Sequence, residues 1–321
     1  MSEFAIDPRL PAGIPDTPGG TVVTVGTMDG VHRGHWAVLE AVRRKAEATG
    51  RPGVLATFDP HPLRIVRPEV APRLLTTPRE KREILAETGL EYAVFIPFTP
   101  VLAQYSPRRF VEEILIGRLR LGSLVIGYDH GFGRGRSGDV QTLRKIGEEM
   151  GFDVEVVPPV LVDGEPISST RIRKAIEQGD VVSAARGLGR PYSLRGPVVR
   201  GDGRGRKLGF PTANIEVGEV DKLLPPDGIY AVRAVLRDDT VDGVLHLGPR
   251  PTFAGSPPTI ELHLFDFDRD IYGEEVRVDF VARLREIRHF DSVAALVAAI
   301  REDCDAARAA LGRSGPRARL P

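Results

Sequence analysis

The chain has 321 residues, of which 41% are hydrophobic and 27% are charged. Its 44 basic and 44 acidic side chains cancel to a formal net charge of zero, which argues against a protein whose whole surface attracts nucleic acid or an anionic membrane. The one cysteine, Cys304, excludes a disulfide framework and a zinc site built from cysteines. At about 150 residues per domain, this length predicts two domains, each with its own core.

The N-terminal part alternates strand-like and helix-like segments. Five short runs rich in apolar and β-branched residues are predicted to be strands, at 21–26, 53–58, 92–98, 123–127 and 153–160. Segments with helical spacing are predicted to be helices, at 35–50, 77–89, 106–119, 139–151 and 167–180, with a last short helix from about Val181. Strands joined by such helices predict right-handed crossovers and a doubly wound parallel sheet.

The pattern changes near residue 190. Alternating or β-branched runs follow one another without helices between them, which predicts a small antiparallel barrel or sandwich. These runs lie at 193–201, 228–237, 240–248, 259–267 and 274–286, and an amphipathic helix closes the chain at 291–311. We therefore expect a domain boundary near Gly187, between a first domain of residues 1–186 and a second of residues 187–321.

The first residues lack the basic and apolar regions of a secretory leader, and no apolar run approaches the roughly 20 residues that span a bilayer. We therefore expect a cytoplasmic protein.

The segment GTMDGVHRGH joins the first predicted strand to the first predicted helix and contains His32, Gly34 and His35. A helix N-terminus offers backbone N–H groups and a partial positive charge, which together bind phosphate. His32 and His35 lie about one turn apart and can donate hydrogen bonds to a phosphate whose charge grows as pyrophosphate leaves. The alternative is an ordinary turn with two surface or capping histidines.

A second segment of this type is ISSTRIR, at 167–173. The hydroxyls of Ser169 and Thr170 can cap a helix, and Arg171 and Arg173 can supply charged donors. Taken alone, this is also a good capping sequence. Two such segments, each placed after strands of one predicted sheet, favour a site for a nucleotide phosphate.

With these two motifs the N-terminal part resembles the nucleotidylyltransferase superfamily. Together with TFDPHP (57–62) and GYDHGFGRGRSGD (127–139), it looks like the FMN adenylyltransferase module of bacterial bifunctional riboflavin kinase/FAD synthetases. The resemblance implies an α/β, Rossmann-like fold that transfers AMP from ATP to FMN, with His32 and His35 as catalytic residues. The ATP-binding residues that it implies are Gly26, Asp29, Gly34, Ser169, Thr170, Arg171 and Arg173, and the flavin-side residues are Phe58, His61 and Asp129. For TFDPHP the alternative is a proline-defined loop in which His61 is solvated.

The stretch 186–207 is rich in arginine and glycine and runs into KLGFPTANI (207–215). Thr212 and Asn214 offer a hydroxyl and a carbonyl oxygen on one side, and such oxygens suit a Mg²⁺ ion that bridges substrate phosphates. The preceding glycines and arginines can supply N–H groups and charge to those phosphates. The alternatives for this stretch are a solvated basic loop and a nucleic-acid site.

Glu261 and His263 lie two residues apart and so share one face of a predicted strand. An inward carboxylate near Mg²⁺ is a candidate general base for a primary hydroxyl. An outward position would make Glu261 an ordinary polar strand residue instead.

GRGRKLGFPTANI (203–215), GIYAV (228–232), GVLHLGPRPTF (243–253) and ELHLFDFDRDIYG (261–273) together resemble the riboflavin kinase module of the same bifunctional enzymes. The resemblance implies a six-stranded flavin-binding barrel that transfers the γ-phosphate of ATP to riboflavin. It implies that Glu261 is the catalytic base and that Thr212 and Asn214 are the metal ligands. The ATP-side residues that it implies are Gly203, Lys207, Gly209, Pro211 and Thr212, and the flavin-side residues, from RLREIRHFDS, are Arg285 and Phe290.

The sequence departs from the family pattern at three places. Met28 and His130 stand where Phe is usual, and Leu245–His246 stands where small or amide residues are more common.

The sequence thus predicts a two-step flavin enzyme that uses ATP and Mg²⁺. Riboflavin would become FMN in the C-terminal barrel, and FMN would become FAD in the N-terminal domain. The expected partners are the small molecules riboflavin, FMN and ATP, with no nucleic acid and no membrane, and the sequence leaves the oligomeric state open.

Two rival functions remain open. One is a nucleotidylyltransferase acting on a phosphorylated choline-like or pantetheine-like acceptor. The other is a non-catalytic RNA-binding or regulatory protein that uses the barrel and the stretch 186–207, although base stacking requires aromatic side chains and only Tyr192 lies in that stretch.

Overall fold

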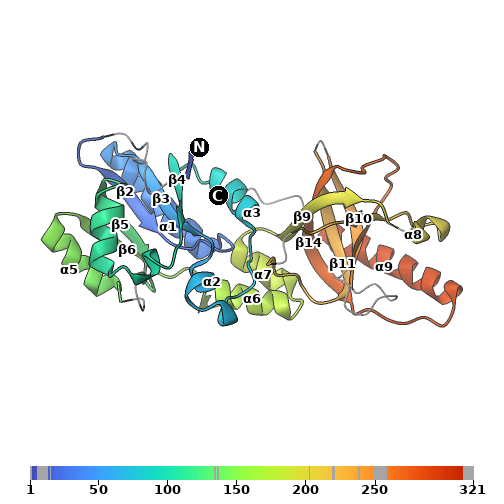
Figure 1. The fold of residues 1–321 in the computed structure, drawn as a ribbon. Coiled ribbons are helices and arrows are strands. Elements are labelled where there is room, and N and C mark those ends of the chain that lie inside the picture. The colour runs from blue at the N-terminus through green and yellow to red at the C-terminus, as the bar shows by residue number, and fades with distance from the viewer. Residues whose placement is uncertain are drawn as a thin grey trace. The chain divides into compact units, whose positions relative to one another are not determined.

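The computed structural model describes residues 2–5, 14, 16–133, 135, 137–201, 203–218, 221–237, 239–248 and 259–313. The chain divides into two compact units, Met1–Ser169 and Thr170–Pro321, which are described one at a time (Figure 1).

The first unit is built on a six-stranded sheet in which all strand pairs are parallel, in the order β1-β4-β3-β2-β5-β6. The strands are β1 Ser2–Ala5, β2 Thr21–Val25, β3 Gly53–Asp59, β4 Tyr92–Pro97, β5 Leu121–Gly127 and β6 Asp153–Val157. The chain runs outward from β2 in one direction to β3 and β4, and then in the other direction to β5 and β6. This reversal confirms the predicted doubly wound sheet and makes the carboxyl end of β2 its switch point.

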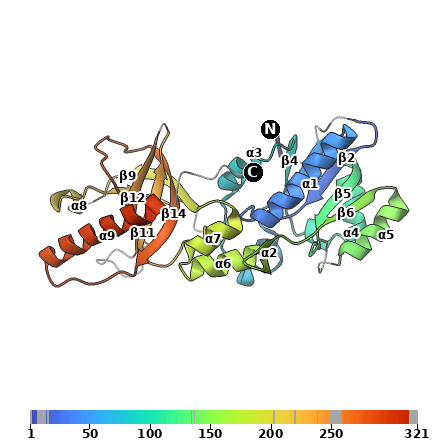
Figure 2. The same cartoon turned by 180° about the vertical axis from the view of Figure 1, so that it is seen from behind.

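Helices cover both faces of this sheet, as Figures 1 and 2 show. On one face, α1 Arg33–Thr49 and α3 Pro78–Ala86 pack against apolar residues of the central strands. On the other face lie α4 Pro107–Phe110, the π-helical segment η3 Val111–Ile116 and α5 Val140–Met150. Side chains along each strand point alternately to the two faces of the sheet, and helices cover both faces. The strands are therefore continuous hydrophobic runs in the sequence.

Local sequence signals set the ends of these helices. Thr77 and Glu80 form a capping box at the start of α3, and Asp139 accepts a backbone hydrogen bond at the start of α5. Gly50 ends α1 with φ of 62°, a left-handed conformation that glycine adopts without strain. The sequence does not predict the short segments of this unit, which are α2 Pro62–Val66, η1 Pro68–Val70, η2 Leu102–Gln104 and the hairpin of β7 Leu161–Val162 and β8 Glu165–Pro166.

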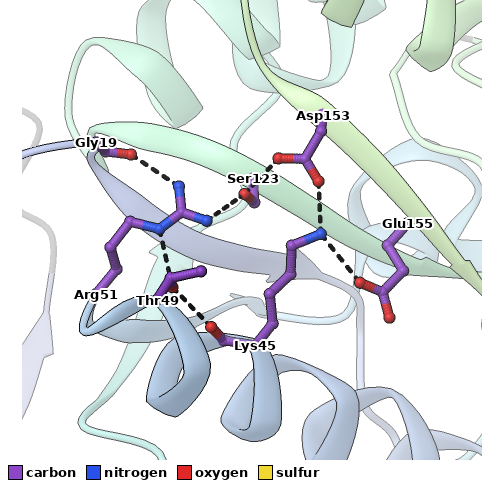
Figure 3. Close-up of polar contacts among 7 residues, drawn as sticks. All are labelled: Gly19, Lys45, Thr49, Arg51, Ser123, Asp153 and Glu155. Atoms are coloured by element: carbon purple, nitrogen blue, oxygen red, sulfur yellow. Dashed lines mark hydrogen bonds and ion pairs between the residues drawn. The ribbon is translucent and has the colours of Figure 1, made fainter.

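The amino edge of the sheet is tied together by a polar network (Figure 3). Lys45 of α1 bridges Asp153 and Glu155 of β6, at 2.5 and 3.0 Å. Ser123 of β5 donates to Asp153 and accepts from Arg51, which precedes β3. Burial raises the pKa of Asp153, but hydrogen bonds from Lys45 and Ser123 outweigh burial and lower it overall. This network lies at the opposite edge from the carboxyl ends of the strands.

The second unit begins at Thr170, within α6 Ser169–Glu177, and continues through α7 Val181–Leu188 into a closed antiparallel barrel in the order β10-β13-β12-β11-β14-β9. The strands are β9 Tyr192–Val199, β10 Ala213–Ile215, β11 Gly228–Val235, β12 Thr240–Gly248, β13 Thr259–Leu264 and β14 Glu275–Arg285. The short helix α8 Arg204–Lys207 and the final helix α9 Val293–Arg313 complete the unit. The closure confirms the barrel and excludes the sandwich.

Residues of the barrel strands alternate between a filled interior and an outer face. Tyr230, Leu245 and Phe280 point inward and are fully buried. Their neighbours on the outer face include Ile229, which packs with other apolar side chains against Leu311 of α9. The outer face under α9 is thus part of the core, whereas the outer face of β10 and β13 carries polar residues.

Within the described ranges, no helix is both long enough and apolar enough to cross a membrane.

Candidate active sites

His32 and His35 cap the N-terminus of α1. Nδ1 of His32 accepts hydrogen bonds from the backbone N–H groups of Gly34 (3.1 Å) and His35 (3.3 Å), and Nδ1 of His35 accepts from the N–H of His32 (3.3 Å). The two rings are stacked, with centroids 3.7 Å apart and an interplanar angle of 16°. Because each Nδ1 is an acceptor, each neutral ring carries its proton on Nε2.

This capping changes the predicted phosphate site. The sequence predicts that the helix N–H groups bind phosphate directly, but those of Gly34 and His35 donate to His32 instead. The capping alternative is therefore observed for both histidines, and it uses Nδ1 of each ring.

Gly26 and Gly34 provide the space that this motif needs. A Cβ at Gly34 would come 3.1 Å from the ring of His32 and 3.4 Å from Ile167. A Cβ at Gly26 would come 3.0 Å from Cε of Met28, whose side chain is only 3% exposed. Both glycines thus leave room for neighbouring side chains. One of these is Met28, the first of the residues that depart from the family pattern.

Asp29 anchors the loop that carries the histidines. Its carboxylate is buried and accepts hydrogen bonds from the N–H groups of Leu75 (3.0 Å) and Thr76 (3.1 Å) and from the hydroxyl of Thr76 (3.3 Å). Its backbone carbonyl accepts from the hydroxyl of Ser169, at 3.0 Å. Asp29 and Ser169 therefore stabilise the conformation of this loop, a role that the sequence does not predict.

Lys81 of α3 is a buried cation that joins the ends of two strands. Its Nζ lies 3.3 Å from the carbonyl oxygen of Thr27, after β2, and 3.2 Å from that of Phe58, in β3. Burial lowers the pKa of this ammonium, and the carboxylates of Asp59 and Asp29 oppose that effect. The sequence does not predict this role of Lys81. Helix α3 has the pattern of an ordinary solvent-exposed helix, and Lys81 is buried only by the tertiary fold.

The three predicted flavin-side residues lie in different surroundings. Phe58 is 7% exposed and belongs to the core, with its ring edge-on to Phe98 at 5.3 Å. His61 follows β3 and caps α2 by accepting the N–H of Leu63, at 3.2 Å. Asp129 is exposed in the turn after β5. Because β3, β2 and β5 are adjacent, His61 and Asp129 flank the strand that leads to His32.

Thr170, Arg171 and Arg173 lie on α6, which confirms a helix that starts within the ISSTRIR motif. Thr170 is exposed, and the two arginines are half-buried. The boundary between the two units falls between Ser169 and Thr170, so these three residues belong to the second unit.

A row of paired residues crosses the outer face of the barrel. Asn214 of β10 is directly opposite Glu261 of β13, Glu261 is opposite His246 of β12, His246 is opposite Ile229 of β11, and Ile229 is opposite Arg285 of β14. Directly opposed residues of neighbouring strands point to the same side of a sheet. Since Ile229 packs against α9 outside the barrel, Glu261 takes the outward of the two positions that the sequence leaves open, and its carboxylate lies outside, level with Asn214.

The loop before β10 packs closely on Thr212 and Asn214. A Cβ at Gly201 would come 2.1 Å from Nδ2 of Asn214, and a Cβ at Gly205 would come 3.1 Å from Oγ1 of Thr212. The sequence marks this loop as Gly-rich but does not show which glycines the approach requires. His263, on the outer face of β13, lies with Nδ1 2.8 Å from the carbonyl oxygen of Pro211.

A cavity of about 350 Å³ adjoins this loop. It is lined by Pro211 and Thr212, by Arg206 of α8 and by the segment 267–272 after β13. The hydroxyl of Thr212 and the cationic side chains of Arg206 and Arg269 in this lining suit phosphate oxygens, and the carboxylates of Asp268 and Asp270 belong to the same lining.

The other predicted ATP-side residues of the barrel lie in the same loop. Gly203 and Gly209 have φ of 66° and 86°, which any residue with a side chain adopts only with strain. The backbone of Lys207 ends α8, while the side chain of Lys207 lies outside the described residues. The part of GVLHLGPRPTF after Gly248 also lies outside them.

Arg285 forms a bidentate ion pair with Asp303 of α9, with both N–O distances 2.7 Å. Its NH1 donates to the carbonyl of Glu286, and its guanidinium lies 5.8 Å from the ring centre of Phe290. The structure thus gives Arg285 a role in docking α9, in addition to the flavin-side role that the sequence predicts for it and for Phe290.

The donor set fits a Mg²⁺ ion that arrives with a nucleotide. Thr212 and Asn214 offer neutral oxygens near a carboxylate, and Mg²⁺ commonly takes one or two protein ligands beside substrate phosphates. Among the described residues, no group of three or more His, Cys, Asp or Glu could hold a metal ion.

Comparisons with known proteins identify both parts of the chain. A family model described as FAD synthetase matches residues 14–171, and one described as riboflavin kinase matches residues 188–311. A curated protein of Escherichia coli K12, "Bifunctional riboflavin kinase/FMN adenylyltransferase", is 37% identical over 92% of this chain and 95% of its own length. The chain belongs to this bifunctional family. Family members from Pseudomonas fluorescens and Bacillus subtilis are 38% and 34% identical and cover 93% and 88% of the chain, or 95% and 90% of their own lengths.

A solved structure from Streptococcus pneumoniae, described as a "Macrolide-efflux Protein", has the same fold. It is 31% identical, with a TM-score of 0.84, over 95% of this chain and 98% of that one.

Proposed function

We infer that the chain makes FAD from riboflavin in two ATP-dependent steps, phosphorylation in the barrel and adenylylation in the α/β domain. One observation carries this inference. The riboflavin kinase and FAD synthetase matches fall on the two regions where the structure places the Asn214–Glu261 pair and the stacked histidines.

In the adenylylation step, a phosphate oxygen of FMN attacks the α-phosphorus of ATP and pyrophosphate leaves. The Nε2–H groups of His32 and His35 donate hydrogen bonds to phosphate oxygens that become more negative during this displacement. The triphosphate is held near Gly26, Gly34 and Asp29 and by the side chains that the motif supplies, which are Ser169, Thr170, Arg171 and Arg173. On the flavin side we assign His61 and Asp129 to direct contact and Phe58 to packing beneath it.

In the phosphorylation step, the primary hydroxyl of riboflavin forms a bond to the γ-phosphorus of ATP. Its proton passes to Glu261, and the bond between the γ-phosphorus and the leaving ADP oxygen breaks. Mg²⁺, when bound, neutralises phosphate charge and is held by Thr212 and Asn214. The remaining residues that we assign are Gly203, Lys207, Gly209 and Pro211 on the ATP side and Arg285 and Phe290 on the flavin side.

We propose that the functional boundary lies near Gly187, which gives domains of residues 1–186 and 187–321. The two family matches end at residue 171 and begin at residue 188, and α7 ends at Leu188. The partners in this proposal are riboflavin, FMN and ATP, which are small cytoplasmic metabolites.

Product analysis tests this function. The chain is incubated with riboflavin, ATP and Mg²⁺, and the flavins are separated by chromatography. FMN should appear first and FAD later, with one ADP and one pyrophosphate for each FAD, and chelation of Mg²⁺ should stop both steps.

Absence of both flavin products would reject the proposal. In that case, release of pyrophosphate with phosphocholine or phosphopantetheine would support a different nucleotidylyltransferase. A salt-dependent shift of RNA would support the binding protein instead.

A further inference from the structure

His246 lies in the middle of the row of paired residues that crosses the outer face of the barrel. It is directly opposite Glu261, which is opposite Asn214 on the next strand. The Cβ atoms of directly opposed residues are about 4.5–5.5 Å apart, so the side chains of one such pair can meet. The imidazole is therefore within reach of the carboxylate that we assign as the base.

One nitrogen of this ring lacks a partner. Within the described residues, Nδ1 of His246 is buried and makes no hydrogen bond. The Cε1–Nε2 edge of the ring packs beside Gly248, where an added Cβ would come 3.3 and 3.5 Å from these two atoms. Buried polar groups are nearly always hydrogen-bonded, so an orphan beside a reaction site calls for a functional explanation.

The charges around His246 are compatible with a neutral ring. Burial lowers the pKa of His246, Glu261 and Asp227 oppose this effect, and Arg285 adds to it. A neutral imidazole has one N–H donor and one acceptor nitrogen. It can therefore donate a hydrogen bond to a carboxylate oxygen without transferring a proton.

Other residues near Glu261 are engaged elsewhere. His263, two residues along the same strand, lies within hydrogen-bond distance of the carbonyl of Pro211. Arg285, at the end of the row, forms a bidentate ion pair with Asp303. Of these neighbours, His246 is the one with an unused buried nitrogen.

We propose that His246 is a positioning residue of the kinase reaction. Its buried Nδ1, which has no partner among the described residues of this structure, donates a hydrogen bond to one oxygen of Glu261 when the flavin substrate is bound and turns the other oxygen toward the hydroxyl of that substrate. This inference rests on the proposed role of Glu261. A carboxylate that is free to rotate spends part of its time with neither oxygen aligned to the hydroxyl, and a partner on one oxygen removes that freedom.

Three variants of the full chain test this role. His246→Leu keeps the size of the side chain but removes its hydrogen bonds, and His246→Asn keeps a short polar group. Thr240→Leu is the matched control, because Thr240 lies on the outer face of the same strand, six residues away. The kcat and KM of riboflavin phosphorylation are measured with Mg²⁺ and ATP, and riboflavin binding is measured by flavin fluorescence.

The expected result is a separation of kcat from binding. His246→Leu should lower kcat about 10- to 100-fold, while the KM and Kd for riboflavin stay within about threefold of wild type. His246→Asn should restore kcat to within about fivefold, and Thr240→Leu should leave it unchanged. The riboflavin Kd reports whether the barrel of each variant is folded, and adenylylation of supplied FMN reports whether the other domain is unaffected.

A double variant separates positioning from packing. If His246 acts through Glu261, adding His246→Leu to Glu261→Gln should slow the residual rate by less than twofold. A further tenfold loss in the double variant, or a kcat of His246→Leu equal to wild type, would overturn the inference alone. A wild-type chain that makes no FMN would overturn the kinase assignment and this inference with it.

Discussion

Single residues at the carboxyl edge of the α/β sheet act mainly by holding loops in place. Lys81 is the clearest case, because its buried Nζ lies within hydrogen-bond distance of the carbonyl oxygens of Thr27, in the loop that leads to His32, and of Phe58, near the end of β3, which leads to His61. We predict that Lys81→Met lowers kcat/KM for FMN adenylylation by at least about tenfold. The loss of one donor leaves two buried carbonyl groups without that partner, and an unsatisfied buried group costs about 1–3 kcal/mol. Steady-state assay of FAD formation from FMN checks this.

Lys45→Met is the matched control for Lys81→Met. Lys45 also bridges distant segments, but at the amino edge of the same sheet and with partially exposed carboxylates (Figure 3). Partly exposed ion pairs contribute about 0–1 kcal/mol, so adenylylation should stay within about twofold of wild type. Equal losses in the two variants would show that Lys81 stabilises the domain in general and not the site.

The sequence predicts the chemistry of single residues better than their contacts. Spacing alone places His32 and His35 on one helical turn, but which nitrogen caps the helix depends on the backbone path of the loop. Asp29 looks like a ligand residue in the sequence, whereas in the fold its carboxylate binds the backbone of residues 75 and 76, more than 40 positions away. Contacts of this kind depend on the tertiary fold and have no local signal.

At the scale of an element, α9 is docked to the barrel by an apolar cluster, a buried ion pair and a hydrogen bond from Arg233 to the carbonyl of Leu311. Ala307 and Leu311 pack on the outer face, and Asp303 binds Arg285 with two hydrogen bonds. We predict that Asp303→Asn destabilises the docking of α9 by about 3–5 kcal/mol, because it leaves the charge of Arg285 buried without a counter-ion. Hydrogen exchange of the amides of α9 measures this loss directly.

The pair of Arg308 and Asp266 gives the comparison for Asp303→Asn. It links the same helix to the segment after β13 at 3.0 Å, but both side chains are more than half exposed. Asp266→Asn should therefore change the exchange of α9 by less than about 1 kcal/mol. Similar effects of the two variants would mean that the apolar cluster alone docks the helix.

Elements with strong periodicity are predicted well, and short ones are not. The central strands and the capped helices of the first unit lie close to their predicted ranges. β10 has only three residues, and its sequence resembles a loop because Pro211 and Gly209 precede it. The choice between the inward and outward positions of Glu261 also depends on the fold, since alternation alone defines two faces but not which one is the interior.

At the scale of the whole molecule, the two reactions should be separable by single substitutions. His32→Asn is sharper than an alanine variant, because asparagine is a good N-cap and can replace the capping acceptor while removing the Nε2–H donor. FAD formation should fall about 100- to 1,000-fold, the usual effect of losing a donor to a transition-state oxygen, while FMN accumulates from riboflavin at the wild-type rate.

Glu261→Gln should have the opposite effect. FMN formation should fall about 100- to 10,000-fold, because the amide cannot accept the proton of the hydroxyl, while supplied FMN is still adenylylated. Both products are measured by chromatography, with riboflavin or FMN supplied, and circular dichroism shows whether each variant is folded. Because each substitution removes one polar group and leaves its backbone contacts in place, loss of both activities from either folded variant would contradict independent sites and require that one centre serve both reactions.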